Sequence, residues 1–131
     1  MVEFTATTVD VSEEDDLLTV QFSGKRKYLQ FVRDLEPDSV RPTYYIEVND
    51  QGGGGYGWAA RVELHRGSIT IVQAKPERMP ELDRVEVAFK IGKRRFDAVA
   101  AALERIFATA PGVFDVREEA EPGAAADGGG M

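Results

Sequence analysis

The segment Thr43–Leu64, TYYIEVNDQGGGGYGWAARVEL, decides the fold of this chain. Apolar and polar residues alternate on both sides of a run of four glycines, Gly52–Gly55. A period of two places successive side chains on opposite faces of a strand, and it indicates an antiparallel sheet with one buried face. We therefore expect a β-hairpin that packs one face into the core and presents the other face to solvent.

The alternation assigns the side chains of this hairpin to faces. The inner face is predicted to hold Tyr44, Ile46, Val48, Trp58, Ala60, Val62 and Leu64. On the outer face, Glu47 and Glu63 are expected to lie across from each other, and Arg61 lies close enough in sequence to neutralise them.

Short strands flank the hairpin, and one helix closes the chain. Strands are expected at residues 2–11, 17–23, 28–32, 68–73 and 84–91. After Gly92 the period changes, because the next apolar residues are spaced as one face of an α-helix: Phe96, Val99, Leu103, Ile106 and Phe107. The sequence thus predicts an α+β fold, a meander-like antiparallel sheet of about six to seven strands with the C-terminal helix packed on one face.

Three cations stand at the expected start of that helix, at Lys93–Arg95. The helix macrodipole disfavours positive charge at this end. We expect the helix to begin later, near Phe96 or Asp97, although an acidic partner or an anion would also explain the cations.

Length and composition are those of one globular domain. The chain has 131 residues, of which 43% are hydrophobic and 30% charged. Residues 1–116 are expected to form a single α+β domain. Residues 117–131 are acidic, rich in Gly and Ala, and without an apolar anchor, so they are expected to form a disordered tail.

Charge and cysteine content limit the partners and the compartment. A net charge of −7 repels nucleic-acid phosphates, so we expect no nucleic-acid partner and expect a basic protein to be attracted. No cysteine is present, which excludes disulfides and thiolate zinc sites and fits the cytoplasm. The sequence has no apolar run of about 20 residues and no signal-like start, so we expect neither a membrane partner nor export.

Catalytic and cofactor motifs are weak. The single histidine, His65, lies in an HRGS turn, where we expect it to be solvated and without a dyad or metal partner. The acidic segment Ser12–Asp16 lacks calcium-loop spacing. The glycines formally match G-x-G-x-x-G, but a strand rather than a helix follows them. The sequence therefore predicts no metal, no cofactor and no enzyme activity.

Several segments carry a family resemblance. The run Tyr44–Gln51 (YYIEVNDQ), followed by Tyr56-Gly57, with YLQF at 28–31 and RIF at 105–107, resembles the Imm10 family of bacterial immunity proteins over residues 3–108. The four-glycine insert and the loop at residues 75–83 depart from the family pattern. The resemblance implies a cytoplasmic antidote that blocks a cognate toxin by direct and non-catalytic binding. Because the chain is acidic, we expect this toxin to be basic or to have a basic active-site region.

The expected partner-binding surface is the outer face and loop of the hairpin, because exposed aromatic rings beside polar groups make good interface anchors. It comprises Tyr45, Glu47, Asn49, Asp50, Gln51, Tyr56 and Trp58. Ordinary cross-strand packing explains Tyr45 and Tyr56 equally well, and the phase of Trp58 favours the core. Two alternatives remain open. One is a small-ligand or carbohydrate module that uses Tyr56 and Trp58. The other is a small hydrolase that uses Glu47 and Glu63 in a concave site with raised pKa values.

Overall fold

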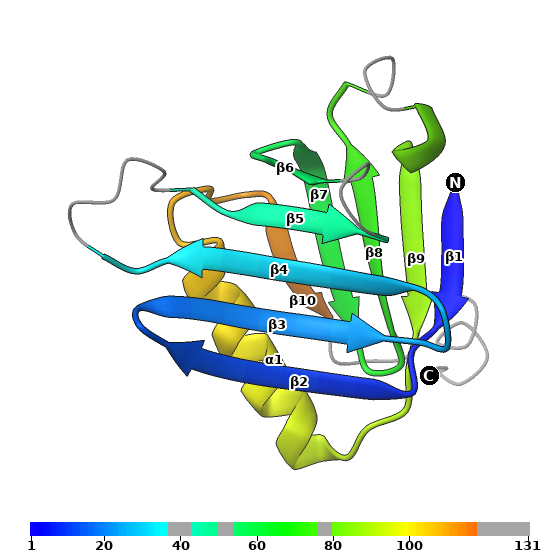
Figure 1. The fold of residues 1–131 in the computed structure, drawn as a ribbon, viewed down its shortest axis with the longest axis horizontal. Helices are drawn as coiled ribbons and strands as arrows, with labels where there is room; N and C mark the ends of the chain where they lie inside the picture. The colour runs from blue at the N-terminus through cyan, green and yellow to red at the C-terminus, as the bar shows by residue number, and fades with distance from the viewer. Residues whose placement is uncertain (37–42, 50–53, 76–79, 118–131) are drawn as a thin grey trace, which may run out of the picture.

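The computed structural model describes residues 1–36, 43–49, 54–75 and 80–117. Within these residues, ten β-strands form two five-stranded sheets, accompanied by one α-helix and one short 3₁₀ helix. The two sheets pack face to face, and their strands run crosswise to each other (Figure 1). The α+β class is therefore confirmed, whereas the single sheet of about six to seven strands is wrong.

The first sheet, sheet A, has the strand order β1-β9-β8-β7-β10. Its strands are β1 (Val2–Thr5), β9 (Arg84–Ala88), β8 (Ser68–Gln73), β7 (Ala59–His65) and β10 (Phe114–Arg117). The inner strands pair antiparallel, but β1 runs parallel to β9 and β10 runs parallel to β7. The 3₁₀ helix η2 (Pro80–Leu82) lies between β8 and β9 in the chain.

The second sheet, sheet B, is antiparallel throughout and has the order β2-β3-β4-β5-β6. Its strands are β2 (Thr8–Glu14), β3 (Leu17–Ser23), β4 (Tyr28–Asp34), β5 (Tyr45–Val48) and β6 (Gly54–Tyr56). The turn between β2 and β3 is made by Asp15 and Asp16, both with positive φ, as in a type I′ hairpin. Of the acidic segment Ser12–Asp16, which was expected to form a polar turn, only Asp15 and Asp16 lie outside the strands, because β2 continues to Glu14.

The helix α1 (Lys93–Ile106) lies beside β10 and behind sheet B, where it covers the part of the inner face that sheet A leaves open (Figure 1). Every residue predicted for its apolar face is buried. Phe107, just after the helix, joins the layers: its ring centroid lies 5.9 Å from Phe31, 4.5 Å from Tyr44 and 5.4 Å from Phe114. One continuous core thus connects both sheets and the helix.

The predicted strand at residues 2–11 is in fact two strands in different sheets. The chain crosses between the sheets at Ala6 and Thr7, whose amides donate to Ala88 of sheet A and to Ser23 of sheet B, each at 2.7 Å. Because Ala6 is small and buried, the chain can pass through the edge of the core at this point.

A second crossing divides the Thr43–Leu64 segment. Strand β5 pairs with β6, and β7 belongs to sheet A, so the predicted hairpin between the two arms is wrong. Gly57 has a φ of 62° at the crossing. The buried hydroxyl of Tyr44 then accepts from the amide of Ala59 and donates to its carbonyl, both at 3.1 Å. These bonds hold β7 against sheet B where the chain changes sheets.

The predicted inner face is otherwise largely correct. Tyr44, Ile46, Val48, Val62 and Leu64 are buried. The exception follows from a register shift between Ala59 and Arg61, which buries Ala59 and exposes Ala60.

The helix begins at Lys93, so the predicted later start is wrong. Two features offset the unfavourable charge. The Lys93 ammonium lies 2.9 Å from the carboxylate of Asp97 one turn along the helix, and Arg95 donates to the carbonyl of Val9 on β2 at 2.9 Å. Because β2 is an edge strand, Arg95 also occupies a backbone acceptor that could otherwise pair with another chain. The predicted tail lies outside the described residues from residue 118 onward, while Arg117 is the last residue of β10.

Candidate functional site

The outer face of sheet B carries a cluster that we call the tyrosine surface, consisting of Tyr28, Tyr45, Glu47 and Tyr56. Strands β4, β5 and β6 supply these residues. The hydroxyls of Tyr28 and Tyr45 both donate to the carboxylate of Glu47, the latter at 2.7 Å. The ring of Tyr45 packs on that of Tyr56, with centroids 5.0 Å apart. The structure therefore brings together three of the predicted site residues and adds Tyr28, which the predicted site omitted.

These hydrogen bonds set the protonation of the cluster. The hydroxyls of Tyr28 and then Tyr45 stabilise the ionised carboxylate and lower the pKa of Glu47 below its usual 4.5. In turn, the hydrogen bond to Glu47, followed by burial, raises the pKa of Tyr45 to about 12. At neutral pH the surface therefore presents one fixed negative charge held between protonated phenols.

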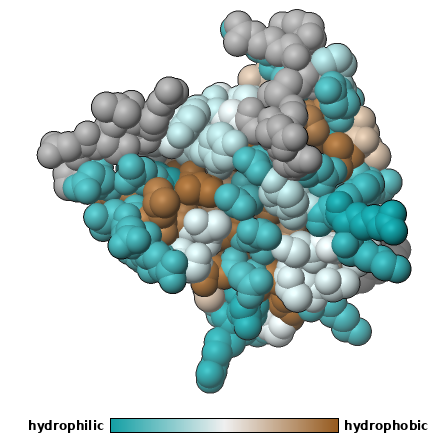
Figure 2. Space-filling view, in the orientation of Figure 1, coloured by the Kyte–Doolittle hydropathy of each residue, from teal (hydrophilic) through white to brown (hydrophobic). Residues whose placement is uncertain are grey.

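Part of the tyrosine surface is open to a partner. Tyr56 is 46% exposed, which makes it one of few large apolar side chains at the surface of the described residues. Figure 2 shows this side of the molecule, where apolar side chains reach the surface between hydrophilic ones. Aromatic rings that are already ordered by neighbours lose little entropy when a partner covers them.

Asn49 has a structural part in the sheet. It sits at the end of β5 with a φ of 50°, its side-chain oxygen accepts from the amide of Tyr28 at 2.9 Å, and its own amide donates to the Tyr28 carbonyl at 3.0 Å. The side-chain oxygen and the backbone amide of Asn49 thus complete the hydrogen bonding between β4 and β5 at this end of the ladder. Asp50 and Gln51, also predicted for the site, lie outside the described residues.

Trp58 packs partly into the core, as its phase predicted. Its indole N–H donates to the carbonyl of Ile46 at 3.2 Å. A Cβ on Gly55 would come within 3.2 Å of the Trp58 ring, so this glycine lets the ring lie against β6. The predicted glycine loop is therefore shorter than expected, because Gly54 and Gly55 pair with β5 as part of β6.

A hollow of about 320 Å³ lies beside Trp58. Its walls include Tyr56, Trp58 and Lys75, so two aromatic residues do line a concave site. The indole N–H is already used by Ile46, which leaves ring faces rather than polar atoms of Trp58 for any ligand.

The carboxylate pair expected for a hydrolase does not form. Glu47 lies on the outer face of sheet B, whereas Glu63 lies on β7 in sheet A, on the far side of the core. Burial pushes the pKa of Glu63 up, but the hydrogen bond and charge of Arg61 and the charge of Arg117 outweigh it, and the net shift is downward. Both carboxyls are therefore biased toward the ionised form, which opposes a role as general acid.

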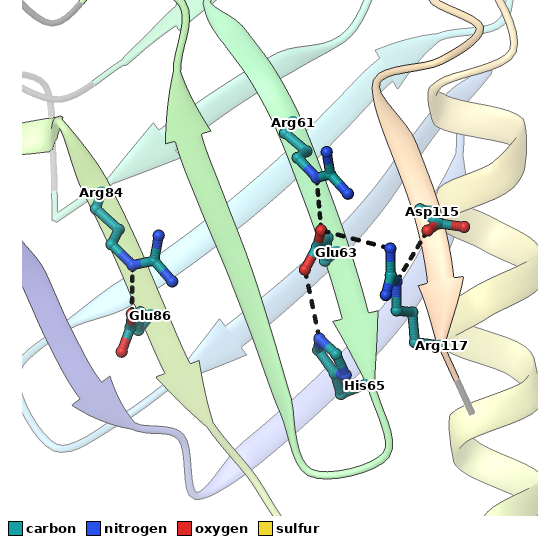
Figure 3. A network of polar contacts seen from close by, with 7 residues as sticks. All are labelled: Arg61, Glu63, His65, Arg84, Glu86, Asp115 and Arg117. Atoms are coloured by element: carbon teal, nitrogen blue, oxygen red, sulfur yellow. Dashed lines mark hydrogen bonds and ion pairs between the residues drawn. The ribbon is translucent and has the colours of Figure 1, made fainter. Parts of the chain in front are cut away.

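Sequence reasoning also misplaced His65, which is only 4% exposed rather than solvated. Its Nε2 lies 3.6 Å from the Glu63 carboxylate, within a network of charged residues on the outer face of sheet A (Figure 3). Arg61 binds Glu63 at 2.5 Å, Arg84 binds Glu86 at 2.5 Å, and Arg117 binds Asp115 at 3.0 Å.

A signal for this network was present in the chain. The tripeptide Arg-Val-Glu occurs at 61–63 and again at 84–86, and Asp-Val-Arg occurs at 115–117. Residues two apart on a strand point to the same face. Each tripeptide therefore predicts an Arg–carboxylate pair on one face of its strand, with the intervening valine on the opposite face.

Two further classes of site find no support in the part of the chain that the structure describes. No group of three or more His, Cys, Asp or Glu side chains is placed to hold a metal ion there. The helices described are too short or too polar to cross a bilayer.

The fold and this surface define a small two-sheet α+β protein whose most distinctive exposed feature is a hydrogen-bonded tyrosine cluster. The family model for Immunity protein 10 (Imm10) matches residues 3–97, a span that includes the whole tyrosine surface. The chain belongs to the Imm10 family, and the predicted resemblance is confirmed. Searches of curated proteins and of solved structures found no match.

Proposed function

We propose that this immunity protein neutralises a cognate toxin by binding it directly, without catalysis, and that the tyrosine surface lies at the centre of the contact. Membership of the Imm10 family supports the antidote role. The observation that carries the choice of surface is the Tyr28–Glu47–Tyr45 arrangement, because a charged carboxylate is fixed there by two hydroxyls beside the exposed ring of Tyr56.

The chemistry of the surface fits a basic partner. The ionised Glu47 supplies an acceptor for a charge-assisted hydrogen bond, and the rings of Tyr45 and Tyr56 offer faces that attract cations. The net charge of −7 adds long-range attraction that speeds encounter with a basic toxin. Action inside the cytoplasm, where such a toxin would meet its target, is part of the proposal.

Co-expression tests this proposal. The toxin encoded beside this gene is expressed with the full chain, with a Tyr45→Ala/Tyr56→Ala variant, and with Leu17→Ala as control. Leu17 is a suitable control because it is 45% exposed and lies on β3 of the same sheet. We expect rescue of growth and co-purification with the natural chain and the control, and loss of both with the double variant. Absence of rescue and of a complex with the natural chain would overturn the proposal.

The hollow beside Trp58 favours a second candidate, a small-ligand module that stacks a sugar or similar ring on Tyr56 and Trp58. Because Trp58 is the only tryptophan, the tryptophan fluorescence of the chain reports on the surroundings of this one residue, which include the hollow. Saturable quenching by a panel of saccharides, absent in Tyr56→Ala, would favour this candidate, and an unchanged spectrum would remove it.

A further inference from the structure

A row of acidic side chains crosses the outer face of sheet A from edge to edge. The pairing register places Glu3 beside Glu86, Glu86 beside Thr70, Thr70 beside Glu63, and Glu63 beside Asp115. Each of the five strands thus contributes one residue, and all but the central Thr70 carry a carboxylate. We call this set the acidic row.

The acidic row conflicts with the usual preference of sheets. Like charges directly opposite each other on neighbouring strands destabilise a sheet, and the row contains two such contacts, Glu3–Glu86 and Glu63–Asp115. Arginines beside the row bind Glu63, Glu86 and Asp115. The side chain of Glu3 makes no hydrogen bond or ion pair with any residue that the structure describes, although its backbone carbonyl accepts from Lys27 at 3.4 Å.

A hollow opens at the centre of the row. Strand β8 presents the short side chains of Ser68 and Thr70 between the long ones of β7 and β9, and the resulting space measures about 440 Å³. Figure 3 shows β8 in this position, with Glu63 on one side and Glu86 on the other. The volume is within the range of small-molecule and side-chain sites.

One polar group in the wall of this hollow has no partner in the part of the chain that the structure describes. Ser68 lines the hollow and is 7% exposed, and its hydroxyl makes no hydrogen bond within the described residues. Buried polar groups normally have a partner. An unpaired hydroxyl beside the carboxylates of Glu63 and Glu86 therefore points to a ligand that donates several hydrogen bonds and carries positive charge.

We propose that the hollow over Thr70 binds the guanidinium group of an arginine in a basic protein segment. Glu63 and Glu86 lie one strand to either side of Thr70, so their backbones are about 9.5 Å apart at the usual strand spacing. A guanidinium side chain fits between them, and its planar fork of five donors suits carboxylates on both sides. The same face already pairs three carboxylates with arginines of the chain itself.

The site goes beyond the proposed function, since it lies on the sheet opposite the tyrosine surface and needs no toxin to be tested. The acidic row extends to Glu3, which also lines the hollow, at one edge of the sheet and to Asp115 at the other. A segment with further basic residues would therefore lie along the row, across the strands, with one arginine inserted over Thr70.

Amide NMR on the full chain tests the proposal, with a Gly-Arg-Gly peptide blocked at both ends as the probe. The matched ligand is the same peptide with citrulline, which keeps the shape of arginine and removes its charge. We expect saturable shifts confined to β1, β7, β8 and β9 with arginine, and none with citrulline. Equal shifts with both peptides, or shifts at β5 and β6 in place of sheet A, would overturn the proposal.

Variants sharpen the result. Glu63→Gln and Glu86→Gln preserve shape and remove charge, and each is expected to weaken binding about fivefold, the typical effect of losing one partly screened ion pair. Glu104→Gln on the exposed side of α1 is the control with the same change of net charge and is expected to bind like the natural chain. If all three variants bind alike, the attraction comes from net charge alone and the site is refuted.

Discussion

The central carboxylate of the tyrosine surface offers a sharp test through Glu47→Gln. Glutamine keeps the size of glutamate and one acceptor oxygen but carries no charge. In the natural chain the carboxylate accepts from the hydroxyls of Tyr28 and Tyr45. The substitution therefore weakens both hydrogen bonds while leaving the packing of the rings in place.

The expected cost follows from these bonds. A hydrogen bond to a charged group contributes about 1.5–3 kcal/mol net, and water screens this partly buried site. We therefore expect a total loss of about 1–2 kcal/mol in the free energy of unfolding near neutral pH. The pKa of Glu47 is lowered in the folded state, so its contribution is present above the unfolded value of 4.5 and is lost as pH falls through the folded pKa.

Urea unfolding of the natural chain and of Glu47→Gln, measured at matched pH values from neutral into the acid range, checks both statements. The difference between the two proteins is expected to shrink as Glu47 becomes protonated in the folded state. Glu104→Gln controls for net charge and is expected to differ little from the natural chain at any pH. A Glu47→Gln penalty that is absent near neutral pH, or that persists unchanged in acid, would refute the assigned hydrogen bonds.

Three other outcomes follow from the structure. Tyr44→Phe leaves the buried amide and carbonyl of Ala59 without the hydroxyl that binds both, so urea unfolding is expected to show a loss of about 2–4 kcal/mol; a loss below that of Tyr45→Phe would be contrary to this account. Gly24→Ala places a Cβ 2.8 Å from a backbone oxygen of β1. Thermal unfolding is expected to show about 1–3 kcal/mol of destabilisation for this variant. Gly67→Ala is the control and is expected to show almost none, because the atom nearest to its Cβ is 3.7 Å away. The phenol of Tyr45 is expected to ionise with a pKa of about 12 in an ultraviolet pH titration, and loss of the neighbouring carboxylate in Glu47→Gln should bring it back toward 10; its stabilising contribution is present below pH 10 and lost as pH rises through about 12.

Local patterns in the sequence predicted local structure well. The bounds of β3 and β8 agree with the expected strands, and the apolar face of α1 is buried as predicted. These elements depend on the period of apolar residues, which a single segment contains in full. The predicted faces of β5 were also correct, because Tyr45 and Glu47 lie on the outer face of the sheet as expected.

The division into two sheets could not be predicted in the same way. The crossing at Ala6 occurs inside a run that was predicted as one strand, and the crossing at Gly57 lies between the two arms of the predicted hairpin. Nothing local distinguishes a second arm that returns to the same sheet from one that joins another sheet. The parallel pairs of β1 with β9 and of β10 with β7 depend on residues far apart in the chain. The same error placed Glu47 and Glu63 across from each other in one hairpin. Because the segment changes sheets, the core separates the two carboxylates instead.

The candidate sites show a similar limit. Tyr45, Glu47 and Tyr56 were found because they share one stretch, whereas Tyr28 reaches the same carboxylate from β4. The burial of His65 depends on the outer face of sheet A, which only the assembled sheet defines. The repeated Arg-Val-Glu tripeptide is a local signal, but the acidic row requires the register of five strands.

The affinity of the cognate toxin for the natural chain and for Tyr45→Ala/Tyr56→Ala, measured by isothermal titration calorimetry, tests the central claim most directly. We expect tight binding by the natural chain and a loss of at least about 2 kcal/mol, roughly 30-fold in Kd, for the double variant, because clustered aromatic anchors carry much of an interface's energy. The Leu17→Ala control is expected to bind like the natural chain. An unchanged Kd for a folded double variant would contradict the assignment of the tyrosine surface, and no binding by the natural chain would contradict the proposed function itself.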